Sequence, residues 1–248
     1  MPEDFLGQYL IGSGKVFVSF NGGLSFIDLG SCPDFEVSMK VDELEHKNYR
    51  SGAAKTDFKI VTGQSASGKC TIETFSSENL NMFLMGNGAA NSSQASGNIT
   101  DQELTVSAMN ASHDLGKLNI SALVVKNAGE TVTYEFGTDY EVDLRAGLIK
   151  PIGSTILKDD VLNLAYTCAL TTIQKVASGK STTMNAEIKF VGDPAKGPIY
   201  LLRGEGTIVP SGSLKLIGKD TASFQIDITF VQGGKYDGFF EIDQIGTV

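Results

Sequence analysis

Residues 63–71 read GQSASGKCT, and the structure of this segment decides how the rest of the chain can be interpreted. Gly63 followed by four residues and Gly68-Lys69 nearly matches a phosphate-binding P-loop, which has Ser or Thr where this chain has Cys70. A P-loop needs a strand before it and a helix after it, because the helix N-terminus helps to bind the phosphates. Here both flanks alternate apolar and polar residues, as strands do. We therefore predict a β-hairpin with its turn in this Gly- and Ser-rich segment, and not a nucleotide site.

Runs of alternating apolar and polar residues extend outward from this segment over most of the chain. Residues 16–20, 35–42 and 224–230 each carry an apolar side chain at every second position. Such alternation is typical of a strand with one face in the core and one face in solvent. Because turn signals rich in Gly, Asn and Pro separate the runs, the pattern predicts an antiparallel β-sandwich or barrel.

Residues 75–87, FSSENLNMFLMGN, break this pattern and predict one short amphipathic helix over residues 76–85. Ser76 can cap the first turn, Glu78 adds a favourable negative charge there, and Gly86 can take the left-handed conformation that ends a helix. The apolar stripe of this helix consists of Leu80, Phe83 and Leu84. Such a stripe either covers one side of the β core or also meets a neighbouring subunit.

Changes in composition divide the chain into three parts. Residues 86–100 are small and polar, as in an exposed linker, and a second group of strands follows them. A further soft stretch begins near Ala177. We therefore expect residues 1–100 and 176–248 to form the two parts of one β core, with residues 101–175 as an inserted β module.

A polar segment, HKNYRSGAAK at residues 46–55, separates two predicted strands. It is longer than the two to five residues of a tight hairpin turn. Its candidate contact residues are His46, Lys47, Tyr49, Arg50 and Lys55. The residues alone leave two interpretations equally open, because a solvated mobile loop and an interface loop can both have this composition, and interfaces are enriched in Tyr and Arg.

No motif in the sequence predicts catalysis, a cofactor or a metal site. The two histidines, His46 and His113, lie in polar segments where we expect them to be exposed, and neither has a partner at a metal-ligand spacing. Acidic pairs such as Asp139 and Asp143 are usually turn residues, since a catalytic pair needs burial to shift its pKa. The three cysteines, which we interpret as small buried apolar residues, are Cys32, Cys70 and Cys168. We therefore expect a binding or structural protein and not an enzyme.

At 248 residues and a formal net charge of −9, the chain is long enough for a sizeable core and too acidic to seek DNA by neutralising phosphates. No run approaches the ~20 apolar residues that a membrane helix needs. The first residues lack the basic and then apolar pattern of a secretion signal. These observations predict a protein that has no membrane segment and is made in the cytoplasm.

The order of several segments is similar to that of the major tail tube proteins of long, flexible-tailed bacteriophages. The segments that carry this resemblance are GSCPDFEVS (30–38), YRSGAAKTD (49–57), FSSENLNMFLMG (75–86), AEIKFVGDPAKGP (186–198) and VPSGSLKLIGKDTASFQIDITF (209–230). GTDYEVDLRAGLIK (137–150) resembles part of an extra β module that some of these proteins carry. The resemblance spans most of the chain and rests on motif order and strand texture.

This resemblance implies a tail tube protein: a mainly β protein with an antiparallel sandwich or barrel, one short flanking helix and an additional β module. Hexameric rings of such a protein stack into a tube, and DNA passes through its acidic lumen without specific binding. The implied partners are further copies of the chain, the tape measure protein, and tail terminator or baseplate proteins. The implied location is the phage tail of the virion, after synthesis in the host bacterial cytoplasm.

The resemblance also implies roles for particular segments. The loop at residues 46–55 would make contacts between stacked rings, the helix would lie between neighbouring subunits, and the extra module would decorate the outside of the tube. Acidic residues on strand faces away from the core could line the lumen, and the candidates are Glu36, Asp42 and Asp227. Lys40 lies on the same strand face as Glu36, so this wall would not be purely acidic.

Three other functions fit the sequence less well. A monomeric β-sandwich binding or adhesin module would present an aromatic platform or a calcium loop, but the chain has no Trp and no clear calcium motif. A tail terminator or baseplate tube protein is a structural alternative of the same kind. A nucleoside triphosphatase would need residues 63–70 to act as a P-loop, which the flanking strand pattern disfavours.

Overall fold

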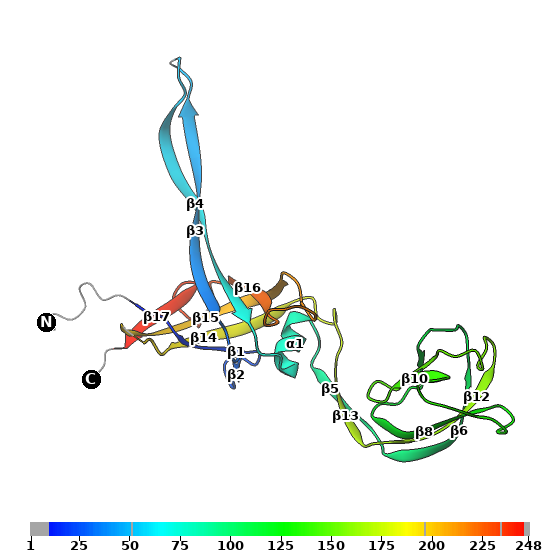
Figure 1. Cartoon of the computed structure of the whole chain (residues 1–248). Coiled ribbons are helices and arrows are strands. Elements are labelled where there is room, and N and C mark those ends of the chain that lie inside the picture. Colours follow the sequence, from blue (N-terminus) through cyan, green and yellow to red (C-terminus); the bar gives the residue numbers. More distant parts are fainter. Residues whose placement is uncertain (1–9, 51, 196, 234, 246–248) are drawn as a thin grey trace. The chain divides into compact units, whose positions relative to one another are not determined.

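The protein is described from a computed structural model that covers residues 10–50, 52–195, 197–233 and 235–245. The chain is mainly β, with several antiparallel sheets and one short helix, and in the described residues no sheet closes into a barrel. It divides into two compact units (Figure 1). Unit 1 combines Met1–Ala89 with Val176–Val248, and unit 2 is Ala90–Lys175.

Unit 1 is built on one large antiparallel sheet in the strand order β2-β1-β14-β15-β16-β4-β3, and β17 also pairs with β15. Its elements are β1 (Gly14–Ser19), β2 (Ile27–Asp28), β3 (Asp34–Asn48), β4 (Lys55–Ile72), α1 (Ser77–Phe83), β14 (Met184–Gly192), β15 (Ile199–Ser211), β16 (Phe224–Phe230) and β17 (Phe240–Ile245). The alternation predicted for residues 224–230 is confirmed, since every second side chain of β16 is buried. One face of this sheet therefore forms the core, which we call the core face, and the other is polar, which we call the polar face.

The sheet curls, so that strands distant in its order meet across the core. Phe35 on β3 stacks on Phe190 on β14, with ring centroids 5.5 Å apart, although three strands separate β3 from β14 in the sheet. The helix α1 packs against β15 and β16, where Phe83 contacts Phe224 with ring centroids 5.0 Å apart. This curl leaves β3 and β17 with one free edge each in the described part of the sheet.

The hairpin turn predicted within residues 63–71 is wrong, because this segment lies inside the single strand β4. The physical reason is packing. Ala66 and Gly68 face the core, and a Cβ added at Gly68 would lie 3.1 Å from the ring of Phe230 on β16. The glycine is needed for close packing of the strands, and not for a turn. Because neither a loop nor a helix is present here, the segment also lacks the geometry of a P-loop.

The hairpin turn lies instead between β3 and β4, beyond Asn48. The last residue of β4 to pair with β16 is Ala66, and from there to the turn β3 and β4 pair only with each other. In Figure 1 this ribbon, drawn in blue and cyan, extends away from the other strands of unit 1. We call residues 40–65 the arm.

The helix starts one residue later and ends two residues earlier than the predicted range of residues 76–85, and Ser76 is its cap. The Ser76 side chain accepts a hydrogen bond from the Asn79 backbone N–H at 3.0 Å, which confirms the cap, and Glu78 lies in the first turn. The left-handed residue that follows the helix is Met85, with φ 52°, and not Gly86. Gly86 is instead buried, where a Cβ would meet the carbonyl oxygen of Ala177.

Unit 2 is a β unit with its own core and no helix among its described residues. Its strands are β5 (Ala89–Gln94), β6 (Gly97–Thr105), β7 (His113–Asp114), β8 (Ile120–Asn127), β9 (Thr133–Tyr134), β10 (Tyr140–Asp143), β11 (Leu148–Pro151), β12 (Val161–Cys168) and β13 (Thr171–Val176). They form a four-stranded sheet (β6-β12-β8-β9), a three-stranded sheet (β10-β11-β7) and the pair β13-β5. Leu162 and Leu164 of β12 and Ile149 of β11 are fully buried, so both larger sheets contribute to one core.

The boundaries of the inserted part differ at one end from those expected. The expected module starts at residue 101, whereas unit 2 starts at Ala90. The polar stretch interpreted as a linker forms β5, which pairs with β13 near the other end of the unit. In the part of the chain that the structure describes, helices long and apolar enough for a membrane span are absent.

Candidate functional site

The arm contains all five residues predicted for the loop at residues 46–55, but both ends of that loop are strand. Strand β3 continues through His46 and Lys47, and Lys55 is the first residue of β4. Tyr49, 76% exposed, and Arg50 lie in the turn itself. The Arg50 backbone N–H donates to the Asn48 side chain at 2.9 Å, which shapes the turn. The structure therefore places these side chains at the end of a long ribbon.

The apolar side chains of the arm change face along its length. Between Asp42 and Glu43 the pairing shifts, because β4 has one extra residue there that has no partner on β3. On both sides of this shift, two cross-strand partners still point to the same face of the arm. Near the sheet, the polar face carries Lys40 and Asp42, which form an ion pair at 3.0 Å. Farther out, the same face of the arm becomes apolar. There it carries what we call the tip patch, which consists of Leu44, Phe58 and Ile60, with the His46 ring stacked on Phe58.

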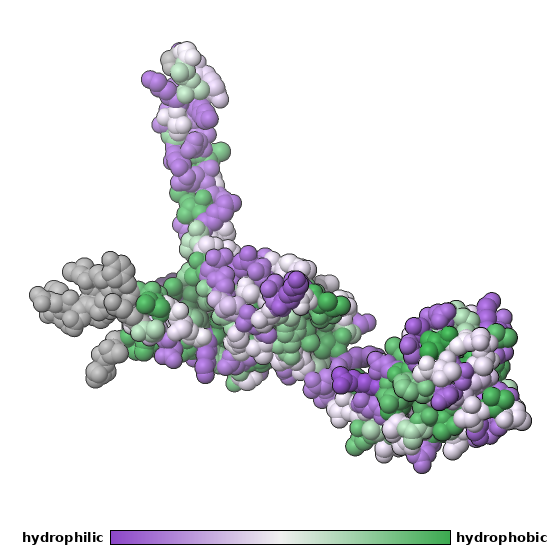
Figure 2. All heavy atoms as spheres, viewed as in Figure 1, coloured by the Kyte–Doolittle hydropathy of each residue, from purple (hydrophilic) through white to green (hydrophobic). Residues whose placement is uncertain are grey.

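The tip patch is exposed, while the opposite face of the arm is mixed, because exposed Val61 lies there among charged side chains. Leu44 is 58% exposed, and Phe58 and Ile60 are each 52% exposed. On the other face, Lys59 forms ion pairs with Glu43 and Glu45. In Figure 2, apolar side chains interrupt the hydrophilic surface along the arm. An isolated two-stranded ribbon is at best marginally stable in water, so an apolar patch on such a ribbon is suited to contact with another surface.

A hydrogen-bonded pair fixes the edge of the tip patch. The Nδ1 atom of His46 pairs with the Asp57 carboxylate, and this contact holds the pKa of Asp57 below its usual range. The same histidine ring stacks on Phe58, with centroids 5.4 Å apart. The exposure expected for His46 is confirmed, since 58% of its side chain is accessible. The ring therefore covers part of Phe58 and leaves its other side to solvent.

The polar face of the sheet brings together two of the three predicted acidic residues. Glu36 on β3 and Asp227 on β16 are the cross-strand partners of Lys69 on β4 from opposite sides. These three residues line a hollow of about 390 Å³ in the polar face, together with Ser38 and Thr229. Asp42 lies farther along β3 on the same face, beside Lys40. The acidic residues thus share one face, but lysines interrupt it.

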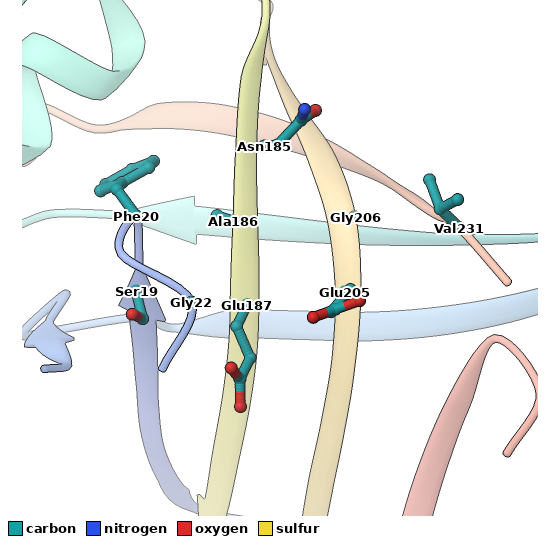
Figure 3. Close-up of a pocket in the computed structure, with 9 residues that line it drawn as sticks. All are labelled: Ser19, Phe20, Gly22, Asn185, Ala186, Glu187, Glu205, Gly206 and Val231. Atoms are coloured by element: carbon teal, nitrogen blue, oxygen red, sulfur yellow. The ribbon is translucent and has the colours of Figure 1, made fainter. Parts of the chain in front are cut away.

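A second hollow on the polar face contains a buried carboxylate that sequence analysis missed (Figure 3). Glu187 on β14 is the cross-strand partner of Ser19 on β1 and of Glu205 on β15. Its side chain is only 5% exposed, and it accepts hydrogen bonds from Lys235 and from the Tyr236 hydroxyl. The alternation around residue 187 indicates only a side chain that points away from the core, and no local signal links it to residues 235 and 236.

The charges around Glu187 shift its pKa and that of its partner tyrosine. Burial raises the pKa of Glu187, but the hydrogen bonds from Lys235 and Tyr236 outweigh burial and leave the pKa below its usual range. Burial and the hydrogen bond to Glu187 raise the pKa of Tyr236. Glu187 is therefore ionised near neutral pH and holds residues 235 and 236 against the sheet.

The predicted stripe of the helix is half-buried. Leu80, Phe83 and Leu84 are each intermediate in exposure, and the fully buried helix residues are Asn79 and Met82. The Asn79 amide donates to the carbonyl oxygens of Leu29 at 3.0 Å and Thr74 at 2.9 Å. Phe83 packs on the core. The stripe thus lies at the margin between core and solvent, where a neighbouring surface could extend the same apolar contact.

The remaining candidate residues have structural roles in unit 2. The prediction that His113 is exposed is wrong, because the residue is only 8% exposed. Its Nε2 accepts from the Ser107 backbone N–H at 3.1 Å, and its Nδ1 donates to the Ala111 carbonyl at 2.9 Å, so both ring nitrogens have a partner. The Asp139 carboxylate accepts from the Glu135 backbone N–H, as expected for a turn residue, and this hydrogen bond lowers its pKa.

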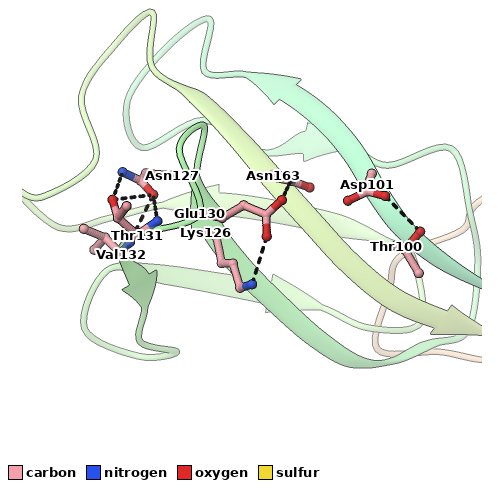
Figure 4. A network of polar contacts seen from close by, with 8 residues as sticks. All are labelled: Thr100, Asp101, Lys126, Asn127, Glu130, Thr131, Val132 and Asn163. Atoms are coloured by element: carbon pink, nitrogen blue, oxygen red, sulfur yellow. Dashed lines mark hydrogen bonds and ion pairs between the residues drawn. The ribbon is translucent and has the colours of Figure 1, made fainter.

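One turn of unit 2 is held by a network of side chains (Figure 4). The Asn127 side-chain oxygen accepts hydrogen bonds from the backbone N–H groups of Thr131 and Val132 at 2.9 and 3.0 Å. Glu130 connects this turn to two strands of the sheet. Its carboxylate forms an ion pair with Lys126 of β8 at 3.2 Å and accepts a hydrogen bond from Asn163 of β12 at 3.1 Å. Such bonds make the turn rigid without requiring a ligand.

A shallow groove of about 470 Å³ lies elsewhere on unit 2. Phe136, which is 64% exposed, lines it together with Glu141, Asp143 and Lys150. The Phe136 ring meets Tyr140 edge-on, with centroids 6.0 Å apart. This is an exposed aromatic ring beside polar groups. Among the described residues, no group of three or more His, Cys, Asp or Glu side chains is arranged to hold a metal ion.

Residues 9–169 match a family described as "Protein of unknown function UCP028589". The match covers the N-terminal part of unit 1, including the arm and α1, and nearly all of unit 2. No curated protein matches the chain.

Proposed function

The chain belongs to the family of unknown function UCP028589, and we propose that it is a structural virion protein that forms the tail tube of a long-tailed bacteriophage. In this proposal, subunits close into hexameric rings and the rings stack into a tube that delivers the genome. The curled sheet of unit 1 acts as the sandwich or barrel core of tail tube type. Unit 2 is the additional β module on the outside.

The exposed tip patch of the arm is the observation that carries this proposal. Leu44, Phe58 and Ile60 lie on a ribbon that pairs with no other described strand. In a stacked assembly, the arm of one subunit lies against a subunit of the next ring, and the patch is buried there. The exposed Tyr49 and Arg50 at the turn add side chains that interfaces favour.

The free strand edges and the helix support closure into rings. β3 and β17 each have one unpaired edge among the described strands. Pairing with a neighbouring subunit would satisfy such an edge and remove an aggregation site, which closed symmetric rings achieve for every subunit. The half-buried Leu80, Phe83 and Leu84 of α1 lie where a neighbour could complete their burial.

The polar face supports a role as the wall of a channel. It presents hydroxyl and charged side chains and includes Glu36, Asp42 and Asp227. The net charge of −9 would make a tube of many subunits strongly acidic. A surface that repels phosphate lets DNA pass without releasing its counterions. The lysines beside these carboxylates reduce the local charge without reversing the sign of the whole chain.

A role in the tail tube also implies the partners and the location of this protein. The main partner is the chain itself, and the tape measure protein and the tail terminator or baseplate proteins contact the lumen and ends of the tube. The protein is made in the host bacterial cytoplasm and ends in the virion. It needs no cofactor and catalyses no reaction.

The test is the mass of the purified protein over a wide concentration range, measured by light scattering after size separation. We expect the mass to rise from that of one 26.4 kDa chain to that of a hexamer and of larger stacks. Because apolar burial is the main force, high salt should not disperse these species. A mass of one chain at every concentration would overturn the proposal.

The groove beside Phe136 supports a second candidate, a monomeric binding or adhesin module. An exposed ring next to Glu141, Asp143 and Lys150 could stack on a sugar and bind its hydroxyl groups. This function requires no assembly. A single-chain mass together with saccharide binding that is lost in Phe136→Ala would favour it over the tail tube.

A further inference from the structure

An apolar groove of about 480 Å³ opens from the core of unit 1. Its lining comes from β1, β3, β14, β15 and β17, and it includes Phe35 of β3, Phe190 of β14 and Leu202 of β15. Ile242 of β17 also lines it and is 51% exposed, so this residue lies at the rim. The volume is within the range of about 300–1,000 Å³ that is usual for ligand pockets, so the groove has room for a few large side chains.

One end of the groove is acidic. Asp34 is the one charged side chain among the described residues that line it, and it stands close to Cys32, which lines the same end. A second carboxylate, that of Glu73, accepts a hydrogen bond at 3.1 Å from the hydroxyl of Ser31, the neighbour of Cys32 in the chain. A partner for this groove should therefore combine apolar side chains with positive charge.

The end of the arm has this combination. The tip patch is apolar and more than half exposed. In and beside the turn that follows it, Lys47, Arg50 and Lys55 carry positive charge. The one carboxylate within residues 46–57 is Asp57, and it is already paired with His46. In a chain with a net charge of −9, the end of the arm is thus apolar and locally basic.

The arm cannot place its tip patch in the groove of its own chain. Phe35 in the groove and Leu44 in the tip patch both belong to β3. The extended strand between them rises about 3.3 Å per residue, which puts the two side chains roughly 30 Å apart. Figure 1 shows the ribbon of β3 and β4 extending away from the other strands of unit 1. The occupant of the groove must come from another molecule.

We propose that the groove of one copy of this chain receives the tip patch of a second copy. The apolar side chains of the patch cover the exposed side of Ile242 and pack against Phe35. The cations of the turn lie near Asp34 and Glu73. This inference rests on the proposed function, because it names the surface on which the arm of a stacked subunit docks.

The proposed contact is heterologous, since it joins two different surfaces of the same chain. Each copy offers one arm and one groove, so the contact can repeat from copy to copy. Because the arm extends away from the sheet that carries the groove, each contact adds the next copy along the direction of the arm. Repetition of this kind gives open-ended stacks, whereas closure into rings depends on other surfaces.

Cross-linking to the native thiol of Cys32 tests the contact in the full chain. In the variant His46→Cys, the new thiol lies beside the tip patch, because His46 and Phe58 are cross-strand partners on that face. Treatment with a short bis-maleimide, followed by mass spectrometry of the linked peptides, should join residue 46 of one copy to Cys32 of another. We expect a ladder of linked chains on a denaturing gel.

Two variants control this experiment. His46→Cys combined with Cys32→Ser should lose the ladder. Glu45→Cys places the new thiol on the opposite face of the arm and should link to Cys32 several times less. Equal linking from residues 45 and 46 would contradict docking of the tip patch.

A charge placed at the rim of the groove gives a second test. Ile242→Arg sets a cation against the basic turn, and because the side chain is already exposed the fold should survive. Stacks should be lost in this variant and kept in Ile245→Arg, which changes an exposed residue of the same strand that is outside the groove lining. Light scattering measures the stacks, and circular dichroism checks the fold.

The outcomes separate this inference from the proposed function. Stacks of the His46→Cys protein that carry no link to Cys32, or equal stacking of the Ile242→Arg and Ile245→Arg proteins, would overturn the groove as the docking site and leave the tail tube proposal standing. A parent protein that remains a single chain at every concentration would overturn both.

Discussion

Replacement of Leu44 and Ile60 by serine is expected to abolish stacking of the rings while the fold of the protein stays intact. The two residues are direct cross-strand partners on the tip patch, and each is more than half exposed. Covering the exposed parts of two aliphatic side chains is worth about 1–3 kcal/mol, so the concentration needed for assembly should rise roughly tenfold to a hundredfold per contact. Because each ring repeats this contact, the combined effect is loss of stacked species.

The adjacent pair on the opposite face supplies the control. Glu45 and Lys59 are also direct cross-strand partners, and they lie one position nearer the turn than Leu44 on β3 and Ile60 on β4. Their joint replacement by serine removes an exposed ion pair with no net change of charge, and assembly should continue. Light scattering measures assembly, and circular dichroism checks the fold. Unchanged assembly of L44S/I60S, or equal loss in E45S/K59S, would contradict a role for the tip patch.

Replacement of Lys235 by methionine is expected to give a large loss of stability. Glu187 is 5% exposed, and without Lys235 its charge keeps only the Tyr236 hydroxyl as a strong partner. Breaking a buried ion pair costs several kcal/mol, but Lys235 is 43% exposed, so water reduces the expected loss to about 1–3 kcal/mol at pH 7. Denaturant unfolding at constant pH measures this free energy.

The pH dependence distinguishes an ionic effect from simple packing. In the parent protein, the lowered pKa of Glu187 gives stability that is present above the unfolded value and is lost as pH falls through the folded pKa. In Lys235→Met, burial is less opposed and the folded pKa rises, so the destabilisation is greatest near neutral pH. The gap between the two proteins should therefore shrink toward about pH 4.

A matched control is Lys215→Met, which removes a weak ion pair with Asp220 at 4.0 Å between exposed side chains. Its loss should change stability by less than about 1 kcal/mol at any pH. A gap between Lys235→Met and the parent protein that stays constant from neutral to acidic pH would show that Glu187 ionisation is not the cause.

Local signals in the sequence were sufficient where one strand or one helix end determines the structure. The alternation of residues 224–230 gave the buried face of β16, because burial in a half-exposed strand follows a period of two. Ser76 gave the start of α1, because the cap needs only residues three apart. The inserted β unit was recognisable because its strand pattern lies between two polar stretches.

The predictions that failed concern residues whose surroundings depend on contacts between distant segments of the chain. Gly68 carries the composition of a turn, but its lack of a side chain serves the packing of Phe230 on a strand far away in sequence. His113 looks polar and exposed in the sequence, but β7 pairs with the distant strand β11, where Ile149 is its cross-strand partner, and the residue is buried. Glu187 likewise gains its partners only when the C-terminal part of the chain returns to β14. No periodicity within one segment encodes such meetings.

Electron microscopy of the purified protein at low and high concentration tests the central claim most directly. The proposed tail tube requires rings with a central hole, and stacks of such rings at higher concentration. The account predicts stacks of hollow rings for the parent protein and E45S/K59S, and unstacked particles for L44S/I60S. Compact single chains at all concentrations of the parent protein, or solid aggregates with no channel, would contradict it.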